Sequence, residues 1–153
     1  MRNMGFPKGV EVTGSAIIEN RRGEILLVRD AKWRNKWVMP GGHVEPGETI
    51  IEAMTREGEE ETELHLKPVA LVTYGELIDS KDFDDPRHFV YFDVHCKAIG
   101  GKVRLHEALN SYRWMKPSDA LKMDLGESYR EVITEFIKYK KKAQGKRRIR
   151  SFV

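Results

Sequence analysis

Met39 to Leu64 read M-P-G-G-H-V-E-P-G-E-T-I-I-E-A-M-T-R-E-G-E-E-E-T-E-L. The first part contains paired glycines and two prolines, which is typical of a tight loop. The second part holds no proline and is rich in good helix formers. Because Thr49 and Glu52 have the spacing of a capping box, a helix is predicted to begin after Thr49 and to run to Leu64. The stretch therefore predicts a glycine loop that leads directly into a helix.

One side of the predicted helix is apolar near its start and acidic near its end. On a helical wheel, a stripe about 120° wide contains Ile50, Ala53, Met54, Glu57, Glu60, Glu61 and Leu64. Unpaired carboxylates that face a core are costly, so the three glutamates are expected to bind cations. Their hard oxygen atoms suit Mg²⁺ or Mn²⁺. The alternative is a solvated acidic face, and the preceding glycine loop favours the metal site.

The charged positions of this stretch resemble the Nudix box of Nudix hydrolases, G-x5-E-x7-R-E-U-x-E-E-x-G-U, in which U is a bulky apolar residue. Gly42, Glu48 and the run Arg56-Glu57-x-x-Glu60-Glu61 occupy its fixed positions with matching spacings. The flanking strand pattern and the chain length are also similar to those of a whole Nudix domain. The resemblance implies an α/β fold, an α/β/α sandwich with a mixed β-sheet between two main helices.

Two positions depart from the box. Gly58 stands where a bulky apolar residue belongs, and Glu63 stands where the last glycine belongs. A glycine inside a helix costs about 1 kcal/mol relative to alanine, and Gly58 is expected to leave a small gap where the helix packs. Without a glycine after its last turn, the helix is expected to end differently or to continue a little. Neither change removes a carboxylate, so the chemistry that the box implies is retained.

The resemblance also implies a role for each charged residue. The metal ligands would be the carbonyl of Gly41 and the carboxylates of Glu57, Glu60 and Glu61, with Mg²⁺ or Mn²⁺ as the cofactor. Arg56 would orient these glutamates through an ion pair with Glu48. The alternative for Arg56 is a surface pair with Glu52, one turn earlier on the helix.

The general base is left open between two regions of the chain. In this family it is a box glutamate or an acidic residue in a loop near the last strands. The predicted catalytic residues are therefore Arg56, Glu60 and Glu61, with Glu107 as the second choice for the base. Among the five histidines, no pair has the H-E-x-x-H spacing of a zinc hydrolase. His43 is the histidine that the loop could bring to a phosphate.

The implied reaction is metal-dependent hydrolysis of a pyrophosphate linkage in a nucleoside diphosphate joined to another group. Markers associated with ADP-ribose (a proline) and with dinucleoside polyphosphates (a tyrosine) are missing beyond the box, where Asp79, Ser80 and Lys81 stand. By elimination a nucleoside triphosphate is favoured, followed by a nucleotide sugar or ADP-ribose. An alternative of another class is a module that binds a nucleotide or RNA without cleaving it. The complete glutamate set favours the enzyme. The candidates for stacking on a base are Trp33, Trp37, Tyr74 and Phe89.

Length and composition indicate one domain. The chain has 153 residues and a single cysteine, Cys96, which excludes an intramolecular disulfide and fits the cytoplasm. Cys96 lies in an apolar run, where a nucleophile is not expected. No apolar run is long enough to span a bilayer. The exposed edges of a small sheet leave room for a homodimer.

The C-terminal end differs in charge from the rest. The net charge is +3, yet eight of the 27 basic residues lie between positions 138 and 150, which leaves 19 basic against 24 acidic residues elsewhere. We therefore divide the chain into a single domain over residues 1–144 and a basic tail over residues 145–153, for which the composition allows disorder. A solvated end is favoured for this tail over a handle for RNA or another polyanion.

The remaining chain predicts further strands and two helices. The predicted strands are residues 10–19, 24–29, 37–39, 68–78, 88–99, 102–105 and 112–115. The predicted helices are residues 117–121 and 128–142, the second with Val132, Ile133, Phe136 and Ile137 facing inward. Residues 79–87 form a polar loop, whose acidic residues are predicted to be solvated rather than a second cation site.

Overall fold

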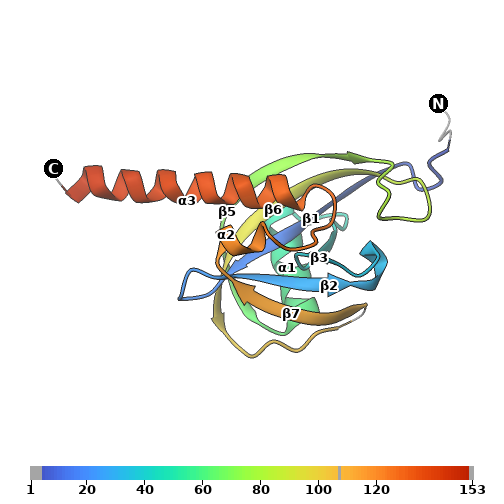
Figure 1. Cartoon of the computed structure of the whole chain (residues 1–153). Coiled ribbons are helices and arrows are strands. Elements are labelled where there is room, and N and C mark those ends of the chain that lie inside the picture. Colours follow the sequence, from blue (N-terminus) through green and yellow to red (C-terminus); the bar gives the residue numbers. More distant parts are fainter. Residues whose placement is uncertain (1–4, 107, 152–153) are drawn as a thin grey trace.

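A central strand, β1, connects the parts of the sheet. β1 (Val10–Glu19) is rich in β-branched residues and pairs in parallel with β6 (His88–Gly100) along its whole length. The computed structural model of the chain describes residues 5–106 and 108–151 (Figure 1). The other strands are β2 (Ile25–Asp30), β3 (Lys36–Val38), β4 (Gly41–His43), β5 (His65–Ile78) and β7 (Leu109–Met115). The helices are α1 (Ile50–Thr62), α2 (Pro117–Ala120) and α3 (Tyr129–Ser151), with a 3₁₀ turn at Ala31–Trp33.

The sheet is mixed, as predicted. β5 pairs antiparallel with β6, while β4 and β2 pair antiparallel with the other side of β1. β2 also pairs with β3 and with β7. The parallel pair β1–β6 joins segments far apart in sequence, and the region between them contains α1 and the hairpin partner β5 (Figure 1).

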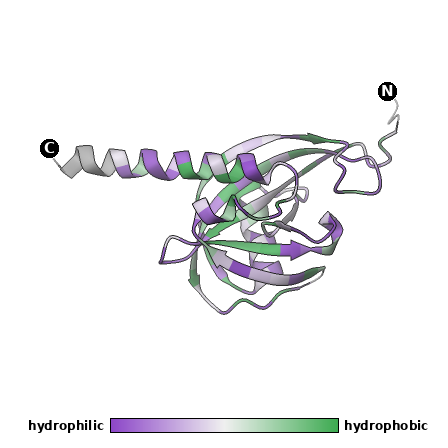
Figure 2. Ribbon diagram, in the orientation of Figure 1, coloured by the Kyte–Doolittle hydropathy of each residue, from purple (hydrophilic) through white to green (hydrophobic). Residues whose placement is uncertain are grey.

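The two long helices cover opposite faces of this sheet. Successive side chains of a strand point to opposite faces. On β6, Cys96 contacts Thr55 of α1 at 3.9 Å, whereas the ring of the neighbouring residue His95 packs 5.2 Å from the ring of Phe136 of α3. Figure 2 shows the apolar strands beneath the helices and a mainly hydrophilic projecting part of α3. The predicted α/β/α sandwich is confirmed.

The start of α1 is the one that the sequence predicts. The Thr49 hydroxyl accepts a hydrogen bond from the Glu52 backbone N–H at 3.1 Å, and the Glu52 carboxylate accepts one from the Thr49 N–H at 3.0 Å. These two bonds satisfy donors that the first turn of a helix leaves unpaired. Glu52 is therefore engaged at the helix start, and the helix begins at Ile50.

The end of α1 corrects one expectation. Glu63 adopts the left-handed conformation of a glycine C-cap, with φ 61°, and its N–H donates to the Glu59 carbonyl at 2.8 Å. The helix therefore ends at Thr62 and neither continues nor ends by another route. A left-handed residue with a side chain costs about 1 kcal/mol or more, a cost that the family's glycine would not incur. The Glu63 carboxylate is hydrogen-bonded to the ring of His106.

Gly58 does not leave the expected gap. It is buried, and a Cβ atom on it would lie 2.7 Å from Leu66 Cδ1 and 3.0 Å from the Ala16 Cβ. β1 and β5 therefore approach α1 so closely that the space of the missing side chain is already filled.

We expect Gly58→Ala to lower the free energy of unfolding by about 1–3 kcal/mol, although alanine is the better helix former. The reason is the overlap with Ala16 and Leu66. Urea unfolding measures the change, and Gly58→Ala combined with Leu66→Val should recover part of it. A Gly58→Ala protein more stable than the original chain would show that a gap is present after all.

The segment after β6 corrects a second expectation. Residues 102–105 do not form a strand. Instead, the Arg104 N–H donates to the Thr62 carbonyl at 2.8 Å and the His106 N–H donates to the Glu61 carbonyl at 3.0 Å. These carbonyls are among those that the last turn of a helix leaves unpaired, so the segment satisfies the end of α1 rather than a sheet edge.

Two other regions also differ from their predictions. In the loop 79–87, Asp82 is buried rather than solvated, and its carboxylate pairs with Lys36 at 2.8 Å and accepts from the Glu127 N–H at 2.7 Å. α3 continues to Ser151, so the segment assigned to the tail begins inside this helix (Figure 1). Within the described residues, no helix is both long and apolar enough to cross a membrane.

Candidate active site

The glycine loop is fastened to β1 next to the start of α1. The Thr13 hydroxyl donates to the Gly42 carbonyl at 2.7 Å, and the Ala16 N–H donates to the Pro40 carbonyl at 2.8 Å. A Cβ atom on Gly42 would overlap the carboxyl group of Glu57. Glycine at this position therefore lets the Glu57 carboxyl group lie directly against the loop, and a larger residue would displace it.

Arg56 connects the loop to the helix, as the resemblance implied. Its guanidinium binds Glu48 through two nitrogens, Nε to Oε2 at 2.7 Å and Nη2 to Oε1 at 2.8 Å. It also donates to Glu57 at 3.0 Å, to Glu60 at 3.2 Å and to the His43 carbonyl at 3.2 Å. The alternative pair with Glu52 is not formed, because that carboxylate caps the helix.

The charge on Glu48 is strongly stabilised. The hydrogen bonds from Arg56, together with one from the Glu45 N–H, lower the pKa of Glu48 to about 2. The same contacts raise the pKa of Arg56. Both groups therefore keep their charges over the physiological pH range, and Arg56 is a fixed cation beside the acidic residues of α1.

Because a lysine cannot reproduce the two-nitrogen contact, we expect Arg56→Lys to raise the apparent dissociation constant for Mg²⁺ by about 10- to 100-fold. The charge is unchanged, so the effect would report positioning. Calorimetric titration with Mg²⁺ measures it, and Arg29→Lys, which changes an arginine outside this network, is the matched control. Equal Mg²⁺ affinities in both variants would contradict the role of Arg56.

The three glutamates of the predicted metal site differ in their placement. Glu57 and Glu61 line a cavity, and Glu61 is only 8% exposed. The side chain of Glu60 is 59% exposed and pairs with Arg56. Across residues 5–106 and 108–151, no three acidic, histidine or cysteine side chains are arranged as a ready metal site. The helix therefore brings two carboxylates to the cavity and leaves the third at its outer side.

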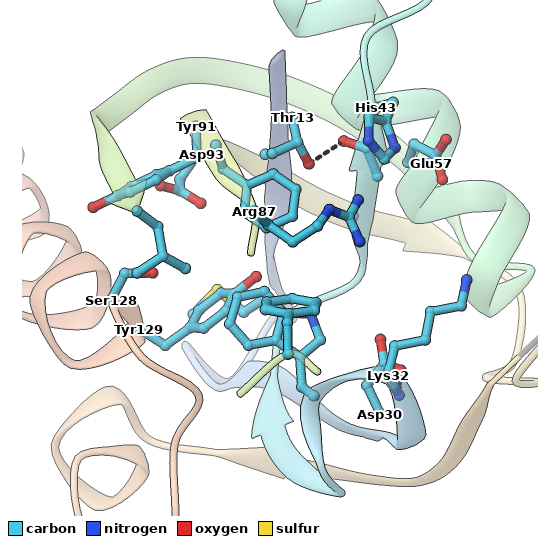
Figure 3. Close-up of a pocket in the computed structure, with 18 of the residues that line it drawn as sticks. Thr13, Asp30, Lys32, His43, Glu57, Arg87, Tyr91, Asp93, Ser128 and Tyr129 are labelled. Carbon is cyan, nitrogen blue, oxygen red and sulfur yellow. Dashed lines mark hydrogen bonds between the residues drawn. The ribbon is translucent and has the colours of Figure 1, made fainter. Parts of the chain in front are cut away.

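The cavity has a volume of about 380 Å³ and two chemically different ends (Figure 3). One end is formed by Gly41, Gly42 and His43 of the loop with Glu57 and Glu61 of α1. In Figure 3, Glu57 and His43 lie on one side, while Asp93, Tyr91 and Ser128 lie on the other. The volume falls in the range of small-ligand sites.

Aromatic rings form another part of the cavity lining. The ring centroids of Trp33 and Phe83 are 4.7 Å apart, and those of Phe83 and Phe89 are 5.4 Å apart. Tyr129 lies 5.5 Å from Trp33. Arg87 lies over Phe83 and Phe89 and binds Glu11 through two nitrogens, at 2.5 and 2.7 Å. A flat, partly apolar ligand suits this lining.

The other sequence candidates divide between the cavity and the rest of the chain. Gly41, Trp33, Phe89 and His43 line the cavity, and His43 is hydrogen-bonded to Glu11 at 2.9 Å. Trp37 and Tyr74 do not line it. Glu107 lies outside the described residues. Cys96 is fully buried, and burial raises the pKa of its thiol to about 11, which agrees with the prediction that it is not a nucleophile.

Sequence reasoning missed much of the cavity lining, including Asp93, Arg87 and Tyr129. Asp93 had a detectable signal, because it is the one acidic residue in the apolar run F-V-Y-F-D-V-H-C (residues 89–96). A charged residue inside a buried strand is rare without a partner or a function. Arg87 and Tyr129 lack such a signal, because only the tertiary fold brings a loop and the start of α3 to this cavity.

The fold and the loop–helix site define a pyrophosphohydrolase of the Nudix type, and comparisons with known proteins agree. The family model described as NUDIX domain matches residues 11–136. A nucleoside triphosphatase NudI of Escherichia coli O17:K52:H18 is 33% identical over 121 residues, which cover 72% of this chain and 86% of that protein. The chain therefore belongs to the Nudix family and is an enzyme that hydrolyses phosphoric anhydrides.

Solved structures show the same fold. A MutT protein from Methanosarcina mazei Go1 superimposes with a TM-score of 0.70 at 25% identity, over 89% of this chain and 99% of that one. A MutT NUDIX hydrolase from Burkholderia pseudomallei gives a TM-score of 0.67 at 26% identity, over 82% and 97%. The likeness thus extends over nearly the whole of these domains.

Proposed function

We propose that this chain is a metal-dependent hydrolase that cleaves a pyrophosphate linkage of a nucleoside triphosphate. The observation that carries this proposal is a single cavity with carboxylates at one end and aromatic rings beside it. Such a cavity suits a ligand with a polyanionic end and a flat heterocyclic end. The similarity to a protein named nucleoside triphosphatase supports the same class of substrate.

We assign the metal ligands to the Gly41 carbonyl and the carboxylates of Glu57, Glu60 and Glu61. The donors are hard oxygens, which fit Mg²⁺ or Mn²⁺, and Gly42 leaves space exactly where the Glu57 carboxylate lies. When bound, the ion would neutralise charge on the phosphate oxygens. Arg56 positions Glu48, Glu57 and Glu60 by the contacts described above.

For the general base we propose Glu61 or Glu60, with Glu107 as the second choice. Glu61 is favoured of the two box residues because it lines the cavity, whereas Glu60 does not. The base would take a proton from the attacking water as the phosphorus–oxygen bond forms. The leaving phosphate departs with the electrons of the anhydride bond.

The test is a screen for release of phosphate and pyrophosphate with Mg²⁺ or Mn²⁺. The compounds are ribo- and deoxyribonucleoside triphosphates, nucleotide sugars, ADP-ribose, dinucleoside polyphosphates and capped RNA, and Glu61→Gln is run beside the original chain. We expect turnover of nucleoside triphosphates that disappears without metal and in Glu61→Gln. Turnover confined to ADP-ribose or nucleotide sugars would overturn the substrate, and metal-independent turnover would overturn the metal.

We further propose that residues 1–144 form the catalytic domain, that residues 145–153 are not needed for the chemistry, and that the enzyme acts in the cytoplasm. The described residues that line the cavity lie between Lys8 and Tyr129 in the sequence. A chain that ends at residue 144 should keep its kcat/KM for nucleoside triphosphates. A large loss of kcat/KM would instead assign this end a part in catalysis.

A further inference from the structure

Asp93 has an unused hydrogen-bond acceptor at the wall of the cavity. It lies in the middle of β6, is 2% exposed, and lines the cavity. Its Oδ1 accepts a hydrogen bond from the Ser15 hydroxyl at 2.5 Å. Its Oδ2 is buried and has no hydrogen-bond partner among the described residues. Buried polar atoms are normally paired, so an exception calls for an explanation.

No cation explains the burial of this carboxyl group. Arg87, which lines the same cavity, is engaged by both oxygens of Glu11. Within the described part of the chain, no lysine, arginine or histidine forms an ion pair with Asp93, whose only side-chain partner is Ser15. A structural ion pair is therefore excluded for these residues, and a donor group of a ligand in the cavity would pair Oδ2.

The position of Asp93 suits the heterocyclic end of a nucleotide. In Figure 3, Asp93 lies across the cavity from Glu57, and Tyr129 and the aromatic rings lie nearby. Ser15 pairs with Asp93 in the parallel β1–β6 register and with Gly41 in the β1–β4 register. The strand that holds the loop therefore also fixes the direction of the free oxygen.

We propose that Asp93 reads the base of the nucleotide, with Oδ2 accepting a hydrogen bond from an exocyclic amino group. This rests on the proposed function. An ionised carboxylate only accepts, so it favours cytosine over uracil, which offers a carbonyl at that position, and guanine over hypoxanthine, which lacks the amino group. A site that uses a hydrogen bond rejects the analogue lacking that group, because its own polar atom is then left unpaired.

The first test uses matched substrates. CTP with UTP, and GTP with ITP, share the ribose and the phosphates and differ at the base edge. We expect the original chain to favour the amino-bearing member of at least one pair by tenfold or more in kcat/KM. Nucleoside triphosphates hydrolysed with ratios near one in both pairs would overturn the role of Asp93 and leave the proposed function intact.

Asp93→Asn tests the direction of the proposed hydrogen bond to the base. Ser15 donates to Oδ1, so the amide should place its oxygen there and its NH₂ in the place of Oδ2. The acceptor becomes a donor, and we expect the preference to invert toward UTP. Ser15→Ala removes the group that orients the amide, so Asp93→Asn combined with Ser15→Ala should lose the inversion. A preference that stays unchanged in Asp93→Asn would overturn the inference.

Binding of CMP, UMP, GMP and IMP, measured by calorimetry, reads the same preference without turnover. Suppose that nucleoside triphosphates are not hydrolysed, but CMP binds at least tenfold more tightly than UMP, or GMP than IMP. The proposed function then fails, while the proposal that Asp93 recognises the base is supported. Equal binding within both pairs would overturn the role of Asp93.

A pH series on the original chain needs no variant. Burial raises the pKa of Asp93 to about 7. Above this pH Oδ2 accepts, and below it the protonated Oδ2 donates, so the preference for amino-bearing bases should fall as the pH drops through about 7. The other ionisable groups that line the cavity are Lys8, Asp30, Lys32, His43, Glu45, Glu57, Glu61, Arg87, Tyr91 and Tyr129. Asp93→Asn keeps all of them, so the same pH dependence in that variant would exclude Asp93 as its source.

Discussion

Replacement of Glu57 by glutamine is expected to lower kcat by about 1,000-fold, which corresponds to about 4 kcal/mol of transition-state stabilisation. Glutamine keeps the size of the side chain and removes the negative charge. Glu57 lines the cavity, and its carboxyl group is packed against Gly42. The measurement is steady-state hydrolysis of nucleoside triphosphates at saturating Mg²⁺, together with the Mg²⁺ dissociation constant from calorimetry.

The matched control for this variant is Glu76→Gln, which removes an exposed carboxylate of β5. We expect its kcat to equal that of the original chain. If Glu57→Gln kept kcat within about threefold of the original value and bound Mg²⁺ equally well, Glu57 would not be a metal ligand.

The second large effect concerns stability, and Asp93→Asn is expected to make the protein more stable at pH 8. Burial raises the pKa of Asp93 from 3.8 to about 7. The folded state therefore holds the proton more tightly than the unfolded state does. As the pH rises from about 4 to about 7, the free energy of unfolding should fall by about 4 kcal/mol, and above this range the loss is complete.

Asparagine carries no charge, so the variant should lack this dependence on pH. Removal of the buried charge raises the free energy of unfolding at high pH. The amide leaves a buried N–H without a partner, which lowers the same free energy by about 1–3 kcal/mol. We therefore expect a net gain of about 1–3 kcal/mol at pH 8 and a net loss of about 1–3 kcal/mol at pH 4. Urea unfolding of both proteins at the two pH values measures the difference. A variant less stable at pH 8, with the pH dependence of the original chain, would mean that the carboxylate contributes to folding.

Together with the base-reading proposal, this stability prediction describes a trade-off. Among the described residues, Ser15 is the only side-chain hydrogen-bond partner of Asp93. A residue that destabilises the fold in this way is expected where function selects it. Asp93→Asn should thus improve stability at pH 8 and invert the choice of base in one step.

The local parts of the site could be predicted from the sequence because short-range rules decide them. The start of α1 depends on Thr49 and Glu52, which are three residues apart, and the helical period places Glu57 and Glu61 on one side. The pair of Arg56 with Glu48 followed from the family resemblance. The inward face of α3 followed from its apolar spacing, and Val132, Ile133 and Phe136 are buried.

The remaining parts depend on contacts that no short-range rule contains. Residues 102–105 have the composition of a strand but hydrogen-bond to the end of α1. Asp82 occurs in a polar loop, yet its carboxylate is buried because it pairs with Lys36 and accepts a hydrogen bond from the Glu127 N–H. The filled space beside Gly58 depends on how closely β1 and β5 approach α1. In each case the partner lies elsewhere in the sequence, and only the folded chain identifies it.

Strand β1 lies between two parts of the cavity that can change independently during evolution. Its edge toward β4 carries the loop of the acidic end, through Thr13 and Ser15, and its edge toward β6 carries Asp93. Substitutions on β6 could therefore change the substrate preference without altering the loop and the glutamates on the other side of β1. In the proposed binding mode, the spacing of β4, β1 and β6 sets the distance between the acidic end of the cavity and Asp93, so a ligand of another length would contact only one of them.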